Sequence, residues 1–336
     1  MTKRSSDGVI WIVGILFAAL AMFIGYELPR HDPAQTDATP QAAVTTATSP
    51  AKAPADKQAA AKPFAPPEGA IPDTDFGKMA QLGAAIFSDT QTNAREFVGN
   101  ALQCANCHLD GGRLANSAPL WAAYVAYPAY RDKNGHVNTF QERVQGCFRF
   151  SMNGKAPPLG SKVLVALESY AYYLAKGAPT GVDLPGRGYP KVNKVANIDS
   201  AHGQQVYEQK CALCHGADGQ GQSSADGAVV FPPLWGARSY NWGAGMESIT
   251  NAAGFIKANM PLSQGNTLTD QEAWDVAAFV NGHERPQDPR FEGSVAETRK
   301  KYHDSAMSLY GQKVNGVVLG ENPPPGGQPA AAATTQ

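Results

Sequence analysis

The stretch CANCH, residues 104–108, recurs as CALCH at residues 211–215, and this pair of motifs decides how the chain folds. Two cysteines separated by two residues fit on one helical turn, where each thiol can add to a vinyl group of haem, and the next histidine can bind the iron. A bare C-x-x-C would leave zinc binding or disulfide exchange open, but the adjacent histidine and the repetition favour haem. We therefore predict two covalently attached haem c groups. The predicted attachment residues are Cys104, Cys107 and His108 in the first copy and Cys211, Cys214 and His215 in the second.

Further landmarks repeat in the same order around the two motifs. Each copy has a helix-like segment before its motif, a Pro-Leu-Trp after it, and a closing amphipathic helix that ends on glycine. These landmarks are residues 76–87, 119–121 and 161–177 in the first copy and 202–210, 233–235 and 269–282 in the second. Thr269 and Glu272 form the T-x-x-E pattern of a helix capping box. The sequence thus predicts a mainly α fold with two tandem cytochrome c-type haem domains, residues 73–185 and 186–290, which meet in the Gly/Pro-rich stretch 179–193.

An uncharged run precedes the repeats, from residue 8 to residue 26. As a helix, these 19 residues would span roughly 28 Å, close to the hydrocarbon thickness of a bilayer. Lys3 and Arg4 come before the run, so we expect residues 1–7 in the cytoplasm and everything after the transmembrane anchor outside. The alternative is a cleaved signal peptide with residues 19–21 as its small-residue site, but the apolar run continues beyond that site. Either interpretation exports the chain to the periplasmic side of the bacterial inner membrane.

The other flanking segments lack the composition of a folded core. Residues 27–72 are rich in Pro, Ala and Thr, so we predict a disordered, extended linker there. Residues 291–336 are predicted to form an extension that ends in a disordered tail. The net charge of the chain is −1 and it carries no basic stripe, which argues against a nucleic-acid partner.

The second copy has one plain candidate for the other axial ligand of its haem. Met260 lies in the segment NMP, between the attachment motif and the closing helix, and a methionine from such a segment is a familiar partner of histidine in cytochromes c. Methionine also fills gaps in protein cores, so a packing role is the alternative. Lys257 lies three residues away and is the weaker candidate.

The first copy has two candidates, both in the stretch QGCFRFSMNG at residues 145–154. Spacing favours Met152, because Met152 and Met260 each lie nine residues before a predicted helix cap. Chemistry favours Cys147, because the other four cysteines are committed to haem and leave it no intramolecular partner in an oxidising compartment. As a thiolate on ferric iron it would be protected. A buried inert thiol and an intermolecular disulfide stay open as alternatives.

These residues give the chain a resemblance to a known family. The pattern YR…ERVQGCFRFSMNG, followed by NMP in the second copy, resembles the thiosulfate dehydrogenases, dihaem cytochromes c that couple thiosulfate oxidatively to tetrathionate. The resemblance covers both haem copies, residues 73–285. It implies that His108 and Cys147 hold the iron of the first, active-site haem. It also implies that His215 and Met260 hold the iron of the second.

The resemblance further implies a substrate pocket beside the first haem. Matching positions give Arg143, four residues before the cysteine, and Ser151, four residues after it, together with Arg131. Guanidinium groups bind oxyanions through forked hydrogen bonds and lower the repulsion between two thiosulfate dianions. Arg113 and Arg149 are further candidates. For each arginine the alternative is a haem propionate partner or a solvated surface charge.

The resemblance implies an oxidoreductase whose electrons pass from the first haem through the second to an external acceptor such as another cytochrome c. Some members carry a lysine directly before the second-haem methionine and exchange ligands, whereas this chain has Asn259, which implies a constant pair of ligands. Cys147 could also leave the iron and carry a covalent sulfonate. The alternatives are a SoxA-type sulfur-oxidation subunit, which needs partner subunits, and a membrane-anchored dihaem electron carrier without catalysis. The histidines expected at the surface or in loops are His31, His136, His202, His283 and His303.

Overall fold

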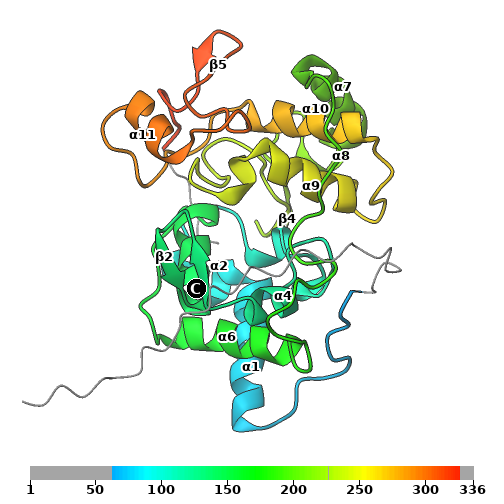
Figure 1. The fold of residues 1–336 in the computed structure, drawn as a ribbon, viewed down its shortest axis with the longest axis vertical. Helices are drawn as coiled ribbons and strands as arrows, with labels where there is room; N and C mark the ends of the chain where they lie inside the picture. The colour runs from blue at the N-terminus through cyan, green and yellow to red at the C-terminus, as the bar shows by residue number, and fades with distance from the viewer. Residues whose placement is uncertain (1–62, 226, 326–336) are drawn as a thin grey trace, which may run out of the picture. The chain divides into compact units, whose positions relative to one another are not determined.

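The first copy of the haem motif folds into a helical domain that is closed by two long helices (Figure 1). The computed structural model describes residues 63–225 and 227–325. In chain order the elements of this domain are α1 (Asp75–Ser88), α2 (Thr90–Asn93), η1 (Arg95–Phe97), η2 (Cys104–Asn106), α3 (Leu109–Gly112), α4 (Leu120–Val125), β1 (Ala129–Arg131), β2 (His136–Asn138), α5 (Phe140–Gly146), η3 (Cys147–Ser151) and α6 (Lys162–Leu174). β1 and β2 pair as an antiparallel hairpin, and η3 is a π-helical turn.

The second copy repeats the plan of a first helix packed on a last one. Its elements are α7 (Ser200–Lys210), α8 (Ala212–His215), β3 (Gln222–Ser223), β4 (Val229–Phe231), η4 (Gly245–Glu247), α9 (Ile249–Asn259) and α10 (Asp270–Asn281). A C-terminal extension adds α11 (Val295–Tyr302) and the hairpin of β5 (Lys313–Val314) and β6 (Val317–Val318). The predicted mainly α architecture is confirmed.

One glycine permits the close helix contact in each domain. A Cβ atom on Gly83 of α1 would lie 2.0 Å from the carbonyl oxygen of Ala166 in α6. A Cβ atom on Gly203 of α7 would lie 2.0 Å from the carbonyl oxygen of Asp275 in α10. A side chain at either position would overlap the partner backbone, so the close approach needs glycine. The two domains therefore share a packing device as well as a motif, which supports their origin as a duplication.

The helix caps follow from local polar residues. The hydroxyl of Thr269 accepts a hydrogen bond from the Glu272 amide at 3.1 Å, and the Glu272 carboxylate accepts one from the Thr269 amide at 2.7 Å. The predicted capping box is thus confirmed. Thr139 and Glu142 make the same reciprocal pair at the start of α5. This second box fixes the beginning of the helix that leads to Cys147.

The end of the predicted linker lies against the first domain. Residues 63–72 have no helix or strand, yet the ring of Phe64 packs on Trp121 with centroids 5.6 Å apart. The carbonyl of Pro67 accepts a hydrogen bond from Arg113 at 2.8 Å. A Pro-rich composition therefore does not keep this part of the linker away from the core, because two side chains anchor it.

The C-terminal extension buries one of the histidines expected at the surface or in loops. His303 lies in the loop that follows α11, but only 2% of it is exposed. Its Nε2 lies 2.9 Å from the Asp288 carboxylate and its Nδ1 lies 3.4 Å from the Glu247 carboxylate. The ring is buried because it joins two carboxylates where the extension packs on the second domain, a long-range contact that no local pattern signals.

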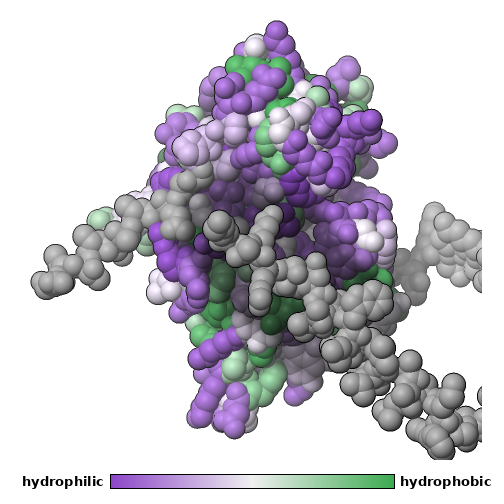
Figure 2. Space-filling model, turned by 90° about the vertical axis from the view of Figure 1, so that its left-hand side faces the viewer, coloured by the Kyte–Doolittle hydropathy of each residue, from purple (hydrophilic) through white to green (hydrophobic). Residues whose placement is uncertain are grey.

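The predicted anchor at residues 8–26, most of the predicted linker and the end of the tail lie outside the described residues. Within residues 63–225 and 227–325, no helix has both the length and the apolar character to cross a bilayer. The face drawn in Figure 2 is largely hydrophilic, with smaller hydrophobic areas between the polar ones. Such a surface is ordinary for helices that bury one side in a core.

Candidate active site and haem cavities

The first attachment motif opens into a cavity of about 250 Å³ that is lined by Cys104, Cys107 and His108. The Nδ1 atom of His108 lies 2.7 Å from the carbonyl oxygen of Ala118, which can only accept, so Nδ1 carries the proton. Nε2 is then left with a free electron pair, as a metal-binding histidine requires. Burial also lowers the pKa of His108 to about 4, so the ring is neutral near pH 7. The cavity thus fits a haem held at this histidine.

The environment of the attachment cysteines favours the protonated thiol, unlike that of a redox-active cysteine pair. Burial raises the pKa of Cys104 to about 12 and that of Cys107 to about 11. Dithiols that exchange disulfides have a depressed pKa instead, because the thiolate is the reactive form. The cysteines of the first motif are therefore suited to thioether attachment and poorly suited to disulfide exchange.

The second motif opens into a separate cavity of about 280 Å³, lined by Cys211, Cys214, His215 and Met260 among others. His215 repeats the arrangement of the first histidine, because its Nδ1 lies 2.9 Å from the carbonyl oxygen of Pro232. Burial lowers the pKa of His215 as well. This cavity contains a histidine and a methionine that fit the two axial positions of one haem.

Lys257 is engaged elsewhere. Its ammonium group donates to the carbonyl oxygen of Leu268 and lies 3.2 Å from the carboxylate of Asp270, at the start of α10. Lys257 is also missing from the described residues that line the second cavity, whereas Met260 lines it. The geometry supports the preference for Met260 as the axial ligand.

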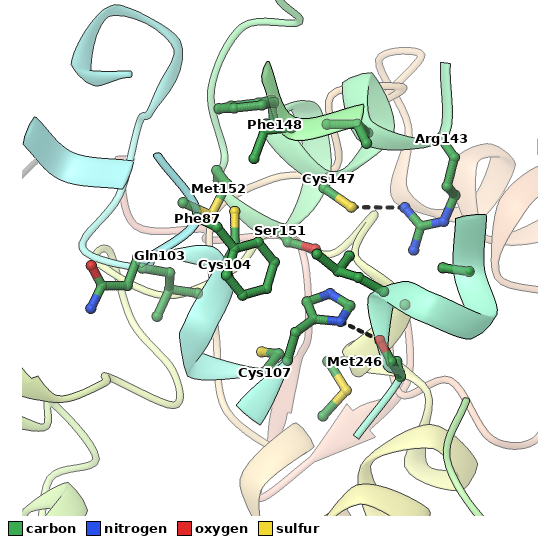
Figure 3. A pocket seen from close by; sticks show the side chains of 18 of the residues that line it. Phe87, Gln103, Cys104, Cys107, Arg143, Cys147, Phe148, Ser151, Met152 and Met246 are labelled. Carbon is green, nitrogen blue, oxygen red and sulfur yellow. Dashed lines mark hydrogen bonds between the residues drawn. The ribbon is translucent and has the colours of Figure 1, made fainter. Parts of the chain in front are cut away.

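The far wall of the first cavity comes from α5 and the π-helical turn η3. Cys147, Ser151 and Met152 all line the cavity. Arg143 donates a hydrogen bond from Nη1 to the sulfur of Cys147 at 2.9 Å, the contact drawn as a dashed line in Figure 3. The pKa of Arg143 is raised, chiefly by the charge of Cys147. A guanidinium that donates to sulfur stabilises the thiolate, which is the form that binds iron.

The structure separates the four candidate arginines into two groups. Arg131 and Arg143 line the first cavity, and Arg131 donates to the hydroxyl of Tyr127 at 2.6 Å. Arg113 and Arg149 do not line it: Arg113 binds the carbonyl of the linker, and Arg149 lies over the ring of Phe150. Two guanidinium groups therefore border the cavity that also holds Cys147.

Comparison with known proteins identifies the family. A curated relative called thiosulfate dehydrogenase, from Thiomonas intermedia strain K12, is 63% identical over 257 residues, which cover 76% of this chain and 82% of the relative. This chain belongs to the thiosulfate dehydrogenase family. A second member, from Stutzerimonas stutzeri strain A1501, is 56% identical and is matched over 80% of this chain and 88% of its own length.

Domain models and a solved structure agree with the family. Residues 93–180 match the SoxA/TsdA cytochrome c domain, and residues 199–280 match the model described as cytochrome c oxidase, cbb3-type, subunit III. The as-isolated thiosulfate dehydrogenase (TsdBA) of Marichromatium purpuratum superposes with a TM-score of 0.74 and 52% identity over 77% of this chain. This chain spans 58% of the length of that solved chain. The prediction of two cytochrome c-type domains is confirmed, and such domains carry haem c.

Three residues that the sequence did not indicate reach the first cavity from outside the first domain. Tyr189 from the interdomain segment, together with Met246 and Asn251 from the second domain, lines that cavity. Burial raises the pKa of Tyr189, so its hydroxyl stays protonated and can donate. Met246 and Cys107 line both cavities. No local pattern marks these residues, because only the packing of the two domains brings them to the site.

Proposed function

We propose that this protein joins two thiosulfate anions through a new sulfur–sulfur bond to form tetrathionate. The observation that carries the proposal is the Arg143–Cys147 hydrogen bond of 2.9 Å, inside the cavity that also holds the first attachment motif. The thiosulfate dehydrogenases that match this chain act on the same substrate by name. This combination supports an oxidoreductase rather than an electron carrier without a reaction of its own.

The reaction balances without protons or a leaving group. Two thiosulfate dianions lose two electrons in total, their terminal sulfur atoms bond, and one tetrathionate dianion results. Arg131 and Arg143 lower the repulsion between the two dianions, because a guanidinium fork fits an oxyanion. The hydroxyl of Ser151 lines the same cavity and can donate a further hydrogen bond. The same groups would serve the reverse reaction, tetrathionate reduction.

Two haem c groups would take up these electrons one at a time. His108 and Cys147 would hold the first iron, and His215 and Met260 would hold the second. A thiolate favours ferric iron and a methionine raises the potential, so electrons would move toward the second haem. Met246 and Cys107 line both cavities, which supports a short route between them. The electrons would leave to an external acceptor, another cytochrome c.

The proposed place of this reaction is the periplasmic side of the inner membrane. The support comes from the sequence, in which residues 8–26 form an uncharged run behind two basic residues. Covalent haem c attachment also belongs to exported domains. Residues 8–26 would remain as a membrane anchor.

Cys147→Ser tests the proposal, because a hydroxyl binds ferric iron far more weakly than a thiolate does. Both haems should still attach, since their motifs are untouched, and the low-spin thiolate signal should disappear from the electron paramagnetic resonance spectrum. Tetrathionate formation from thiosulfate with an artificial acceptor should fall at least about 100-fold, the usual scale for loss of an active-site group. Tetrathionate formation at an undiminished rate would refute the active-site role.

A further inference from the structure

The segment between the two candidate sulfur ligands has an unusual winding. Cys147 and Met152 are five residues apart, and both line the first cavity. The backbone from Cys147 to Ser151 forms a π-helical turn, which has more residues per turn than an α-helix and is frequently found at functional sites. The winding of this turn therefore decides how each of the two sulfur atoms is directed.

A single residue of the second domain, Asn241, holds this turn through its side chain and its backbone amide. Asn241 is fully buried. Its Nδ2 donates to the carbonyl oxygen of Arg149 at 3.0 Å and to the side-chain oxygen of Asn153 at 2.9 Å. Its backbone amide donates to the carbonyl oxygen of Phe150 at 3.3 Å. Two of the three contacts fall on the turn between Cys147 and Met152, and the third falls on Asn153, directly after Met152, so Asn241 binds the chain between the two sulfurs and just beyond the second.

The acceptor side of Asn241 is also fixed. Its Oδ1 accepts a hydrogen bond from the amide of Gly243 at 3.0 Å, which sets the orientation of the amide group and points both Nδ2 hydrogens at the turn. A Cβ atom on Gly243 would lie 2.5 Å from the ring of Phe150. The loop of the second domain therefore approaches η3 closely, and Asn241 is oriented before it makes the contact.

A second buried asparagine holds the end of the turn. Asn100 donates from Nδ2 to the carbonyl oxygen of Ser151 at 2.8 Å and to that of Ser239 at 3.0 Å. Its Oδ1 accepts from the amide of Leu102 at 3.0 Å, two residues before the first attachment cysteine. The turn is thus tied both to the haem-attachment loop and to the second domain, with its carbonyl groups as the points of attachment.

We propose that Asn241 is a positioning residue that fixes the π-helical turn so that Cys147, rather than Met152, is the sulfur ligand of the first haem. The inference rests on the proposed function, in which Cys147 binds that iron. Arg143 stabilises the thiolate from one side, and Asn241 keeps the backbone in the winding that presents it. Without the Nδ2 donor of Asn241, the carbonyl oxygen of Arg149 and the side-chain oxygen of Asn153 lose a hydrogen-bond partner, and a rewound turn satisfies them better.

Asn241→Asp tests this proposal with the least change in shape. A carboxylate still accepts from Gly243 but cannot donate to the turn. We expect a second low-spin ferric species in the electron paramagnetic resonance spectrum and a far-red absorption band typical of an iron–methionine bond. The midpoint potential of the first haem should rise, because thioether replaces thiolate. The kcat should fall by about 10- to 100-fold, the scale expected for a small misplacement of the reacting groups, with a smaller change in KM for thiosulfate.

Met152→Leu makes the test specific. In the wild-type background this change should leave the thiolate signal in place. Combined with Asn241→Asp, it should abolish the new iron–methionine band, because the alternative ligand is gone. Asp275→Ala is the matched control: this second-domain side chain is also fully buried, but its partners are Asp199, His202 and Gln271, all outside the π-helical turn. It should lower stability and leave the spectrum unchanged.

The outcomes separate this inference from the proposed function. If the wild-type protein shows no thiolate signal, the proposed ligand set is wrong. If the wild-type protein shows it and Asn241→Asp keeps a single unchanged species, Asn241 does not select the ligand and only this inference is overturned. If neither Asn241→Asp nor Asn241→Ala accumulates with both haems attached, Asn241 serves folding as a whole, and the positioning role is likewise overturned.

Discussion

At the scale of single residues, Arg143 has the most specific arrangement in the site. It lies in the last turn of α5 and lines the first cavity, and its guanidinium donates to the Cys147 sulfur at 2.9 Å. Among residues 63–225 and 227–325, no other hydrogen bond engages its side chain, which leaves the remaining donors of the fork for an oxyanion. One side chain can therefore stabilise the thiolate and lower the repulsion between substrates, which a simple surface charge would not do.

Arg143→Lys should separate charge from geometry. The lysine keeps the positive charge but loses the forked donors, so we expect kcat/KM for thiosulfate to fall by about 10- to 100-fold, the equivalent of about 1.5–3 kcal/mol for a charge-assisted hydrogen bond. Steady-state kinetics with an artificial acceptor measures this. Arg187→Lys is the control, since Arg187 pairs with exposed Asp183. Equal kinetics for Arg143→Lys and the wild type would contradict the role.

At the scale of elements, helix positions were the easiest features to predict. The expected segments 76–87 and 269–282 correspond to α1 and α10 within two residues at each end, because apolar periodicity and polar caps are local signals. The π-helical turn was not predicted. Its winding depends on hydrogen bonds to Asn100 and Asn241, which lie 51 and 92 residues from their partners Ser151 and Arg149.

Gly203→Ala should destabilise the second domain, although alanine normally stabilises a helix relative to glycine. The added Cβ would lie 2.0 Å from the carbonyl oxygen of Asp275, so α7 and α10 would have to separate. We expect a loss of about 1–3 kcal/mol or more in the free energy of unfolding, as for other overpacked sites. Chemical denaturation of the holoprotein measures it. Gln204→Ala, at the exposed neighbouring position, should change stability by no more than about 0.5 kcal/mol; a stabilised Gly203→Ala protein would contradict the packing argument.

At the scale of the whole molecule, the first cavity belongs to both haem domains. Asn251 and Met246 reach it from the second domain, and the amide of Ala101 donates to the carbonyl of Arg238 at 3.0 Å across the domain contact. The C-terminal extension joins the same region, because His303 and Ser308 bind Glu247, the residue next to Met246. The extension thereby braces the turn that lies between the two cavities.

His303→Gln should reduce stability in a pH-dependent way. Burial opposes protonation of His303, but the hydrogen bonds and charges of Asp288 and Glu247 prevail and raise its pKa above the ordinary value. A raised pKa adds stability that is fully present below the unfolded value of about 6.5 and is lost as pH rises through the folded value. The variant should therefore lose about 1.5–3 kcal/mol at acidic pH and less at alkaline pH. Denaturation of both proteins across this range measures it; a difference that grows with pH would contradict the assignment.

The sequence by itself determined what is local and covalent. Each C-x-x-C-H motif contains all the atoms predicted to attach a haem and to bind one face of its iron, and the spacing of caps and apolar residues specifies the helices around it. The sequence also indicated Met260 and Cys147 as candidate iron ligands and several arginines as candidate substrate-binding residues. Spacing favours Met152 and chemistry favours Cys147, and no local pattern decides between them, because both lie on one short segment whose winding is not set locally.

Only the tertiary structure decided which of these residues share a cavity. It placed Arg131 and Arg143 in the lining of the cavity that also holds Cys147 and left Arg113 and Arg149 outside that lining. It brought Asn241 from 94 positions beyond Cys147 onto the turn that carries the cysteine. The physical reason is that backbone carbonyl groups need donors, and the donors for this turn come from Asn100 and from Asn241, which lies in the other domain. The predicted attachment of haem therefore follows from two short motifs, whereas the geometry around the Cys147 sulfur is a property of the folded pair of domains.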